Sequence, residues 1–303
     1  MNLRQLGYFV AVVDSGSFSR AAKRANVAQP ALSEQIAGLE DELGIRLLIR
    51  SQRGIEATAA GLMLYGRARS VLTAIDNIRD ELKSDSEPSG EVVIGLPSAL
   101  GAVLASPIVS AAVQRHPKLR VRIVEAPSHL QRQSLRRGEL DLAIVFDDEL
   151  LPALERRPLY TQQLFLVEQR DGRREASGVA SLADLAGVPL LMPGRSTRES
   201  VVLALKSIGA EANVVAEANS TRTLLALVDA GVGAAIVPSW VADRGDLRWR
   251  RIAEPISPMT VSLYTVAGVP RSESVNAVIQ LAERVILERV QLADWRGALA
   301  YVP

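Results

Sequence analysis

Residues 29–35 carry polar side chains whose types and spacing suit the recognition of DNA bases. Gln29, Ser33, Glu34 and Gln35 fall on one side of a helix predicted over 29–43. Such short polar groups form hydrogen bonds with base edges in the major groove. The alternative is a helical hairpin packed in a core, with these groups merely solvated, because helix pairs are common in all-α folds.

Two short helices joined by a tight turn must position that polar face. The first helix is expected to begin after Ser17, whose hydroxyl can cap it, and to carry Arg20 on its outer side. Pro30 suits the first turn of the second helix, and Gly44 is expected to end it. Apolar residues recur at helical spacing along the second helix and are expected to be buried: Leu32, Ile36, Leu39 and Leu43. With a supporting helix over 2–15, this pattern predicts a helix-turn-helix.

An arginine-containing hairpin is predicted after the second helix. The apolar run 47–49 reads as a strand, and Gly54 suits a turn. Arg50 and Arg53 would then lie where they can contact phosphates, which gives non-specific, salt-dependent affinity. Alone, such arginines are more simply a solvated surface. Next to a helix-turn-helix they favour a winged DNA-binding domain over residues 1–58.

The composition restricts the remaining function classes. The 303 residues are 48% hydrophobic with a net charge of +1, so we expect several domains with sizeable cores and only a local basic surface. The absence of cysteine and the presence of only two histidines argue against disulfides, thiolate zinc sites and histidine metal clusters. No nucleophile–base pair or glycine-rich phosphate loop is recognisable, so we expect neither an enzyme nor a cofactor. Without a signal peptide or a long apolar segment, we expect a cytoplasmic protein with no membrane contact.

Residues after Thr58 read as one long helix to about Lys83. Its apolar residues repeat at nearly heptad spacing: Leu62, Tyr65, Ala68, Leu72, Ile75, Ile78 and Leu82. Such a seam needs a partner, so we predict a dimer, which would also place two reading helices on one duplex. The alternative is that the seam packs on the chain's own carboxy-terminal domain. We assign residues 59–89 to a linker, which consists of this dimerisation helix and a hinge. The polar stretch 84–90 at its end marks a domain boundary.

The remaining chain, 90–303, alternates short apolar strands with helices. Strands are expected at 91–97, 119–125, 141–146, 164–169, 188–194, 213–218, 233–239, 247–252 and 260–268, and helices at 99–115, 129–137, 197–208, 220–230 and 272–292. This alternation predicts parallel α/β sheets with right-handed crossovers, in two lobes of about 90–162 plus 268–303 and 163–267. Ligands of such sheets bind at the carboxyl ends of strands, here Pro97-Ser98, Phe146-Asp147, Pro193-Gly194 and Val237-Pro238.

The amino-terminal 65 residues resemble the LysR-type transcriptional regulators. The matching residues are Ser17-Phe18, Ala21-Ala22, the run QPALS at 29–33, Gln35-Ile36, Leu39-Glu40, Leu43-Gly44, Leu47, Arg50, Arg53-Gly54, Thr58 and Ala60-Gly61. The stretches 125–146 and 229–238 also resemble the family, and 191–200 is similar to its nitrogen-assimilation-control branch. Leu48 stands where the family usually has phenylalanine, and Ala57 where it usually has leucine. Because both residues are apolar, these departures affect the packing of the wing rather than the function.

This resemblance implies a winged helix-turn-helix dimer, often paired into a tetramer, with a periplasmic-binding-protein-like effector domain. A small-molecule effector would bias how the DNA-binding domains sit on promoter DNA, and RNA polymerase would be a further partner. The resemblance assigns Gln29, Pro30 and Ser33 to base contacts, and Arg50 and Arg53 to contacts with the DNA backbone. The full set of residues that we assign to DNA binding is Arg20, Gln29, Pro30, Ala31, Ser33, Glu34, Arg50 and Arg53. By position, the effector pocket would include Ser98, Ser128, Phe146, Pro193, Ser196, Asn219 and Ser220.

Several of these cleft residues allow a second interpretation. Ser98 and Ser128 could donate to a carboxylate or another anion at a helix N-terminus, or could simply cap their helices. Arg195 and Arg198 could pair with an acidic ligand or be solvated. For the whole chain, the competing hypothesis is a cytoplasmic solute-binding protein without DNA regulation, against which the missing signal peptide argues.

Overall fold

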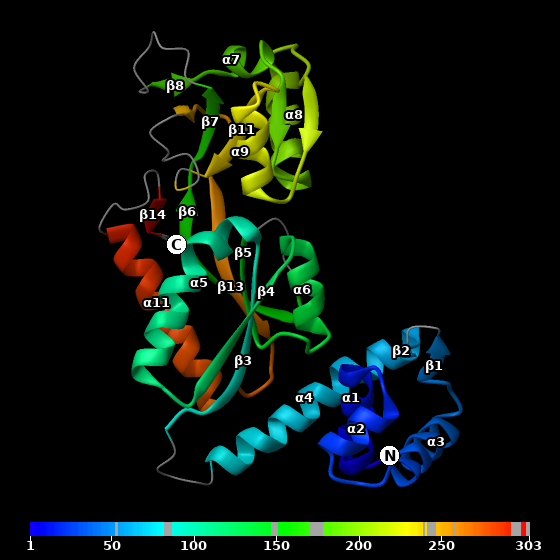
Figure 1. Cartoon of the computed structure of the whole chain (residues 1–303). Coiled ribbons are helices and arrows are strands. Elements are labelled where there is room, and N and C mark those ends of the chain that lie inside the picture. Colours follow the sequence, from blue (N-terminus) through cyan, green and yellow to red (C-terminus); the bar gives the residue numbers. More distant parts are fainter. Residues whose placement is uncertain are drawn as a thin grey trace.

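The chain folds into a small, mostly helical domain followed by two α/β lobes. The computed structural model describes residues 1–51, 54–81, 87–146, 151–169, 178–238, 240, 247–256, 258–291 and 298–300. In Figure 1 the amino-terminal domain, drawn in blue, leads through the long helix α4 to the two lobes. Within the described residues, no helix combines the length and the apolar character needed to cross a membrane.

The amino-terminal domain is a winged helix-turn-helix, as predicted. Its elements are α1 (Leu3–Ser15), α2 (Phe18–Arg24), α3 (Gln29–Leu43), β1 (Leu48–Ser51) and β2 (Gly54–Ala57). Ser17 caps α2 by accepting a hydrogen bond from the Arg20 backbone N–H, and Gly44 ends α3 with a φ of 66°. Leu43 is 39% exposed, contrary to the prediction, because the core that α3 shares with α1 and α2 ends at Leu39.

Helix α4 (Ala59–Glu81) carries the predicted seam, which its own chain covers only in part. Tyr65 packs on the amino-terminal domain and Ala68 is buried. Leu62 and Ile78 are 49% and 54% exposed. Leu82 lies outside the described residues. The seam therefore keeps apolar positions open to solvent in a single chain, and the dimer stays a prediction.

Lobe 1 is a six-stranded mixed sheet with helices on both faces. The strand order is β14 (Ala298–Ala300), β6 (Leu154–Gln162), β13 (Met259–Val266), β5 (Leu142–Phe146), β3 (Gly90–Leu96) and β4 (Leu119–Glu125). The apolar faces of α5 (Ser98–Arg115) and α11 (Glu273–Gln291) pack on one side of the sheet, and α6 (Ser128–Arg136) packs on the other. This places α5 and α6 so that both begin at the same edge of the sheet, after β3 and β4.

Lobe 2 repeats this arrangement with a second six-stranded sheet. Its order is β10 (Val214–Glu217), β9 (Leu190–Met192), β11 (Ala234–Pro238), β7 (Leu164–Gln169), β12 (Leu247–Ile252) and β8 (Val179–Ala180). The helices α7 (Leu182–Ala186) and α8 (Arg195–Ser207) contribute to the core on one face, and α9 (Thr221–Asp229) to that on the other.

The sheets differ from the sequence prediction in two respects. They are mixed rather than parallel, because β13 runs antiparallel to β5 and β6, and β7 runs antiparallel to β11 and β12. Since β13 pairs within lobe 1, lobe 2 ends before Met259, and the predicted boundary at 267 was wrong. The sequence reading also missed β6, whose central Pro158 and paired arginines conceal its strand character.

Candidate DNA-binding surface and interlobe cleft

Helix α3 presents the predicted polar face to solvent. Gln29, Pro30, Ala31 and Glu34 are exposed and Ser33 is half-buried, while Leu32 faces the core. The turn before α3 is held by a hydrogen bond from the Val27 backbone N–H to the Ala22 carbonyl at 3.0 Å, and Asn26 adopts a left-handed φ of 54°. The four exposed positions and Ser33 therefore form one continuous surface at the first turns of the helix.

A buried carboxylate fixes the wing to α3. Glu40 is 9% exposed, and its Oε1 accepts hydrogen bonds from the backbone N–H groups of Leu47 at 2.6 Å and Leu48 at 3.0 Å. Arg46, which is largely exposed, adds an ion pair at 3.4 Å. The base of β1 is thus attached to the same helix that carries the polar face. Sequence reasoning missed this role of Glu40.

The predicted basic contacts are only partly described. Arg20 is exposed, but its Nε donates to the Ser15 carbonyl at 3.1 Å, so its guanidinium also ties α2 to the end of α1. Arg50 lies in β1 opposite Ile55, and its side chain is outside the described part of the structure. Arg53 lies outside the described residues altogether.

A cavity of about 560 Å³ lies between the two lobes at the carboxyl ends of their strands. Six of the seven predicted pocket residues line it: Ser98, Ser128, Phe146, Pro193, Asn219 and Ser220. The side chain of the seventh, Ser196, is not among those described. Sequence reasoning missed Glu125, Thr197 and Met259, which also line the cavity. That the predicted residues contact a ligand remains a prediction.

Among the described residues, two hydrogen bonds join the start of α5 to lobe 2 beside the cavity. Ser98 Oγ donates to the Asn219 carbonyl at 2.7 Å, and Trp240 Nε1 donates to the Ala99 carbonyl at 3.2 Å. Each bond connects the start of α5 in lobe 1 with lobe 2. The hydroxyl proton of Ser98 is therefore already used in a bond to lobe 2.

The serines at the helix starts have different roles. Ser98 and Ser128 do not cap α5 and α6, because Pro97 and Pro127 occupy the N-cap positions. Ser220 does cap α9, where its hydroxyl accepts a hydrogen bond from the Thr223 backbone N–H. The hydroxyl of Ser128 forms no hydrogen bond with any described residue, so it is a free donor and acceptor at the cavity wall.

The charged side chains that line the described cavity wall are acidic. Glu217 pairs with Arg198 at 2.7 Å, whereas Glu125 forms no ion pair or hydrogen bond with a described residue. No lysine or arginine is among the described lining residues, and the Arg195 side chain is not described. His129 is the one described lining residue that could carry a positive charge.

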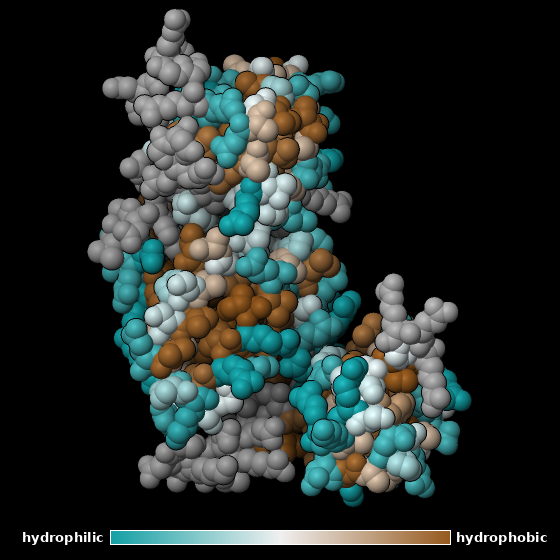
Figure 2. Space-filling view, viewed as in Figure 1, coloured by the Kyte–Doolittle hydropathy of each residue, from teal (hydrophilic) through white to brown (hydrophobic). Residues whose placement is uncertain are grey.

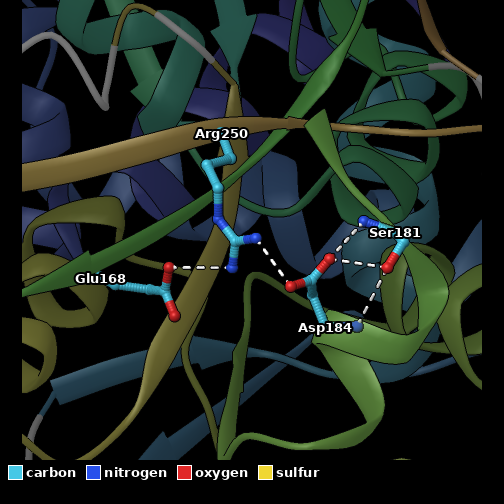
Figure 3. Close-up of polar contacts among 4 residues, drawn as sticks. All are labelled: Glu168, Ser181, Asp184 and Arg250. Carbon is cyan, nitrogen blue, oxygen red and sulfur yellow. Dashed lines mark hydrogen bonds and ion pairs between the residues drawn. The ribbon is translucent and has the colours of Figure 1, made fainter. Parts of the chain in front are cut away.

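Figure 3 shows a polar cluster in lobe 2 that consists of Glu168, Ser181, Asp184 and Arg250. Arg250 on β12 donates to Asp184 at 2.8 Å and to Glu168 on β7 at 3.2 Å, while Ser181 donates its hydroxyl to Asp184 at 2.6 Å. The hydrogen bonds from Ser181 and Arg250 hold the pKa of Asp184 far below its ordinary value. None of these residues lines the cavity, so the cluster serves to attach α7 to the sheet.

Comparison with known proteins identifies both halves of the chain. Residues 3–62 match the family described as "Bacterial regulatory helix-turn-helix protein, lysR family", and residues 85–286 match the "LysR substrate binding domain". The nitrogen assimilation regulatory protein nac of Klebsiella aerogenes is 30% identical over 310 residues, covering 96% of this chain and 99% of that protein. This agrees with the resemblance of 191–200 to that branch.

Solved structures extend the match to the fold. A full-length OxyR variant from Pseudomonas aeruginosa has a TM-score of 0.77 at 24% identity, covering 100% of this chain and 99% of that one. Full-length CbnR in complex with its target DNA has a TM-score of 0.65 at 25% identity, covering 94% and 100%. The chain therefore belongs to the LysR family of bacterial DNA-binding transcriptional regulators, which carry a substrate-binding domain and are not enzymes.

Proposed function

We propose that α3 reads promoter DNA and that the wing contacts the phosphate backbone beside it. Gln29, Pro30 and Ser33 would contact base edges, with Arg20, Ala31 and Glu34 on the same surface and Arg50 and Arg53 on the backbone. The observation that carries this proposal is the exposure of the polar face of α3 while its apolar side is buried. The similarity to CbnR, solved with its target DNA, supports it.

A mobility-shift experiment on the duplex upstream of the gene tests this assignment. Ser33→Ala should reduce the discrimination between that duplex and a scrambled one, because a lost base contact costs about 1–3 kcal/mol. Ser19→Ala, the same change on the exposed side of α2, should leave discrimination unchanged. Absence of any shift by the wild-type chain at low salt would refute the proposal.

We propose that the protein acts in the cytoplasm as a dimer or tetramer that influences RNA polymerase at a promoter. The exposed Leu62 and Ile78 of α4 support self-association, because apolar residues on a long helix are stabilised by a partner. The face shown in Figure 2 also carries an apolar area over α5. Sedimentation of the wild type against Ile78→Glu should show a lower mass for the variant.

The interlobe cavity is proposed to bind the small-molecule effector. The charges along its wall favour a zwitterion over a simple carboxylate, because a free Glu125 would repel a ligand that is only anionic. The free hydroxyl of Ser128 at the start of α6 would receive a carboxylate, since a helix N-terminus favours negative charge. Glu125 would receive an ammonium group.

Thermal-shift measurements on the full chain separate these ligand classes. Free α-amino acids should raise the melting temperature more than dicarboxylates of similar size, because only the amino acids offer an ammonium group to Glu125. A ligand at 100 times its dissociation constant adds about 2.7 kcal/mol to the free energy of unfolding. Glu125→Gln should abolish the amino-acid response while leaving any dicarboxylate response unchanged or stronger. A stronger response of the wild type to dicarboxylates would instead support a purely anionic effector.

A further inference from the structure

The linker helix touches lobe 1 at a residue that has to be glycine. Gly66 of α4 is buried, and a Cβ built on it would lie 1.6 Å from the Arg137 carbonyl oxygen and 2.6 Å from its carbonyl carbon. Cβ atoms essentially never come within 3.0 Å of such atoms. Because the neighbour is backbone rather than a movable side chain, only the absence of a side chain permits this approach.

Arg137 connects that contact to the ligand cavity through one short helix. It is the C-cap residue of α6, whose nine residues span about 13 Å. The other end of α6 begins with Ser128 and His129, which line the cavity. Figure 1 shows the end of α6 directed toward α4. A side-chain contact at the cavity and a backbone contact at the linker helix therefore lie at opposite ends of one rigid element.

The same part of α4 is held by the DNA-binding domain. Tyr65 donates its hydroxyl proton to Asp14 of α1 and packs against the core of that domain. The Arg69 guanidinium lies 5.9 Å from the centre of the Tyr65 ring. Burial raises the pKa of Asp141 in lobe 1, and the hydrogen bond from Val93 and the positive charge of Arg69 both oppose that rise. Residues 65–69 thus contact both domains within about one helical turn.

We propose that Gly66 and Arg137 are positioning residues that couple the interlobe cavity to the DNA-binding domain through α6. This inference rests on the proposed function, since it takes the chain to bind promoter DNA. A molecule that displaces the start of α6 moves the Arg137 carbonyl at its other end. Because Gly66 is in tight contact with that carbonyl, α4 has to move with it. By linkage, DNA binding must act on α6 with the same coupling.

Amide hydrogen exchange of the full chain, with and without the upstream duplex, tests the coupling without knowledge of the effector. In the wild type, the duplex should change exchange over residues 128–138 by about fivefold or more, the lower end of typical allosteric coupling. Gly66→Ala should abolish that change, because the added methyl separates α4 from Arg137. Gly7→Ala is the matched control, since it places the same methyl in a helix with no atom within 4 Å.

Asp141→Asn supplies a milder second variant, because it keeps an acceptor for Val93 and removes the charge that attracts Arg69. It should reduce the exchange response without abolishing it. If the wild-type chain binds the duplex but amide exchange over residues 128–138 does not change, the coupling is refuted while the proposed function stands. The same holds if Gly66→Ala shows an undiminished exchange response. A wild-type chain that binds no duplex would instead refute the proposed function.

Discussion

The attachment of the wing to α3 depends on a single carboxylate, Glu40, and substitutions there should loosen the wing. Both bonded N–H groups, those of Leu47 and Leu48, lie in a buried part of the chain and share one carboxylate oxygen. Hydrogen bonds to a charged acceptor contribute about 1.5–3 kcal/mol each, against about 0.5–1.5 for neutral pairs. Glu40→Gln keeps the acceptor but removes its charge, so we expect a cost of about 2 kcal/mol.

Glu40→Ala removes the acceptor and leaves two buried donors unsatisfied, at about 1–3 kcal/mol each. We therefore expect about 4 kcal/mol for this variant, roughly twice the cost of the glutamine variant. The ion pair with Arg46 adds little to either value, because Arg46 is mostly in solvent. In amide exchange, a cost of about 2 kcal/mol corresponds to opening of the wing about 30 times more often.

Exchange at Leu47 and Leu48 and DNA affinity are the two measurements that check this. Asp41→Asn is the matched control, because it removes the same charge from a neighbouring exposed position. Loss of one negative charge strengthens attraction to phosphates in both variants. Weaker DNA binding by Glu40→Gln than by Asp41→Asn therefore isolates the position of the wing. Equal affinity, together with unchanged exchange at these two residues, would refute the reasoning.

Two further substitutions test contacts away from the DNA surface. Asp184→Asn should flatten the dependence of lobe 2 stability on pH: the folded pKa of Asp184 lies below its unfolded value of about 4, so its contribution is present above that pH and lost below it. Urea unfolding followed by tryptophan fluorescence should separate variant and wild type at about pH 7, and the difference should shrink progressively as the pH falls below about 4. Tyr65→Phe removes the bond to Asp14 and should cost about 1 kcal/mol, seen as faster amide exchange in the first turns of α4 while lobe 1 is unchanged.

Local signals in the sequence were sufficient to predict the helix ends of the DNA-binding domain. Ser17, Thr58 and Gly44 each act through bonds or backbone angles within a few residues, so their roles as caps and stop could be predicted. The exposure of Leu43 could not, because it depends on where the covering helices end. The role of Glu40 escaped notice for a similar reason, since its partners lie seven and eight residues away in the wing.

The effector lobes were harder because their sheets are assembled from distant segments. The strand β13 reads as a strand in isolation, but only its pairing with β5 and β6 assigns it to lobe 1. The cavity was found through a topological rule, since strand ends such as Pro97 and Phe146 meet between the lobes. The same rule could have found Glu125, which ends the predicted strand 119–125.

The heptad seam of α4 illustrates a different limit of the pattern. Apolar spacing predicts that a face is covered, but not which chain covers it. Gly66 lies inside that helix next to the seam and is a recognisable signal of close packing, because glycine otherwise weakens a helix by about 1 kcal/mol. The structure places the Arg137 carbonyl at that position.

Within a single chain, closure of the lobes alone would not reach the contact between α4 and lobe 1. The bonds from Ser98 to Asn219 and from Trp240 to Ala99 relate lobe 2 to lobe 1, whereas Gly66 of α4 touches lobe 1. A ligand that only brought lobe 2 closer would leave the contact at Arg137 unchanged. The proposed coupling therefore requires a displacement within lobe 1, and α6 begins at the cavity and ends at α4. On this reasoning, effectors that contact Ser128 should alter DNA binding more than equally tight ligands held by lobe 2.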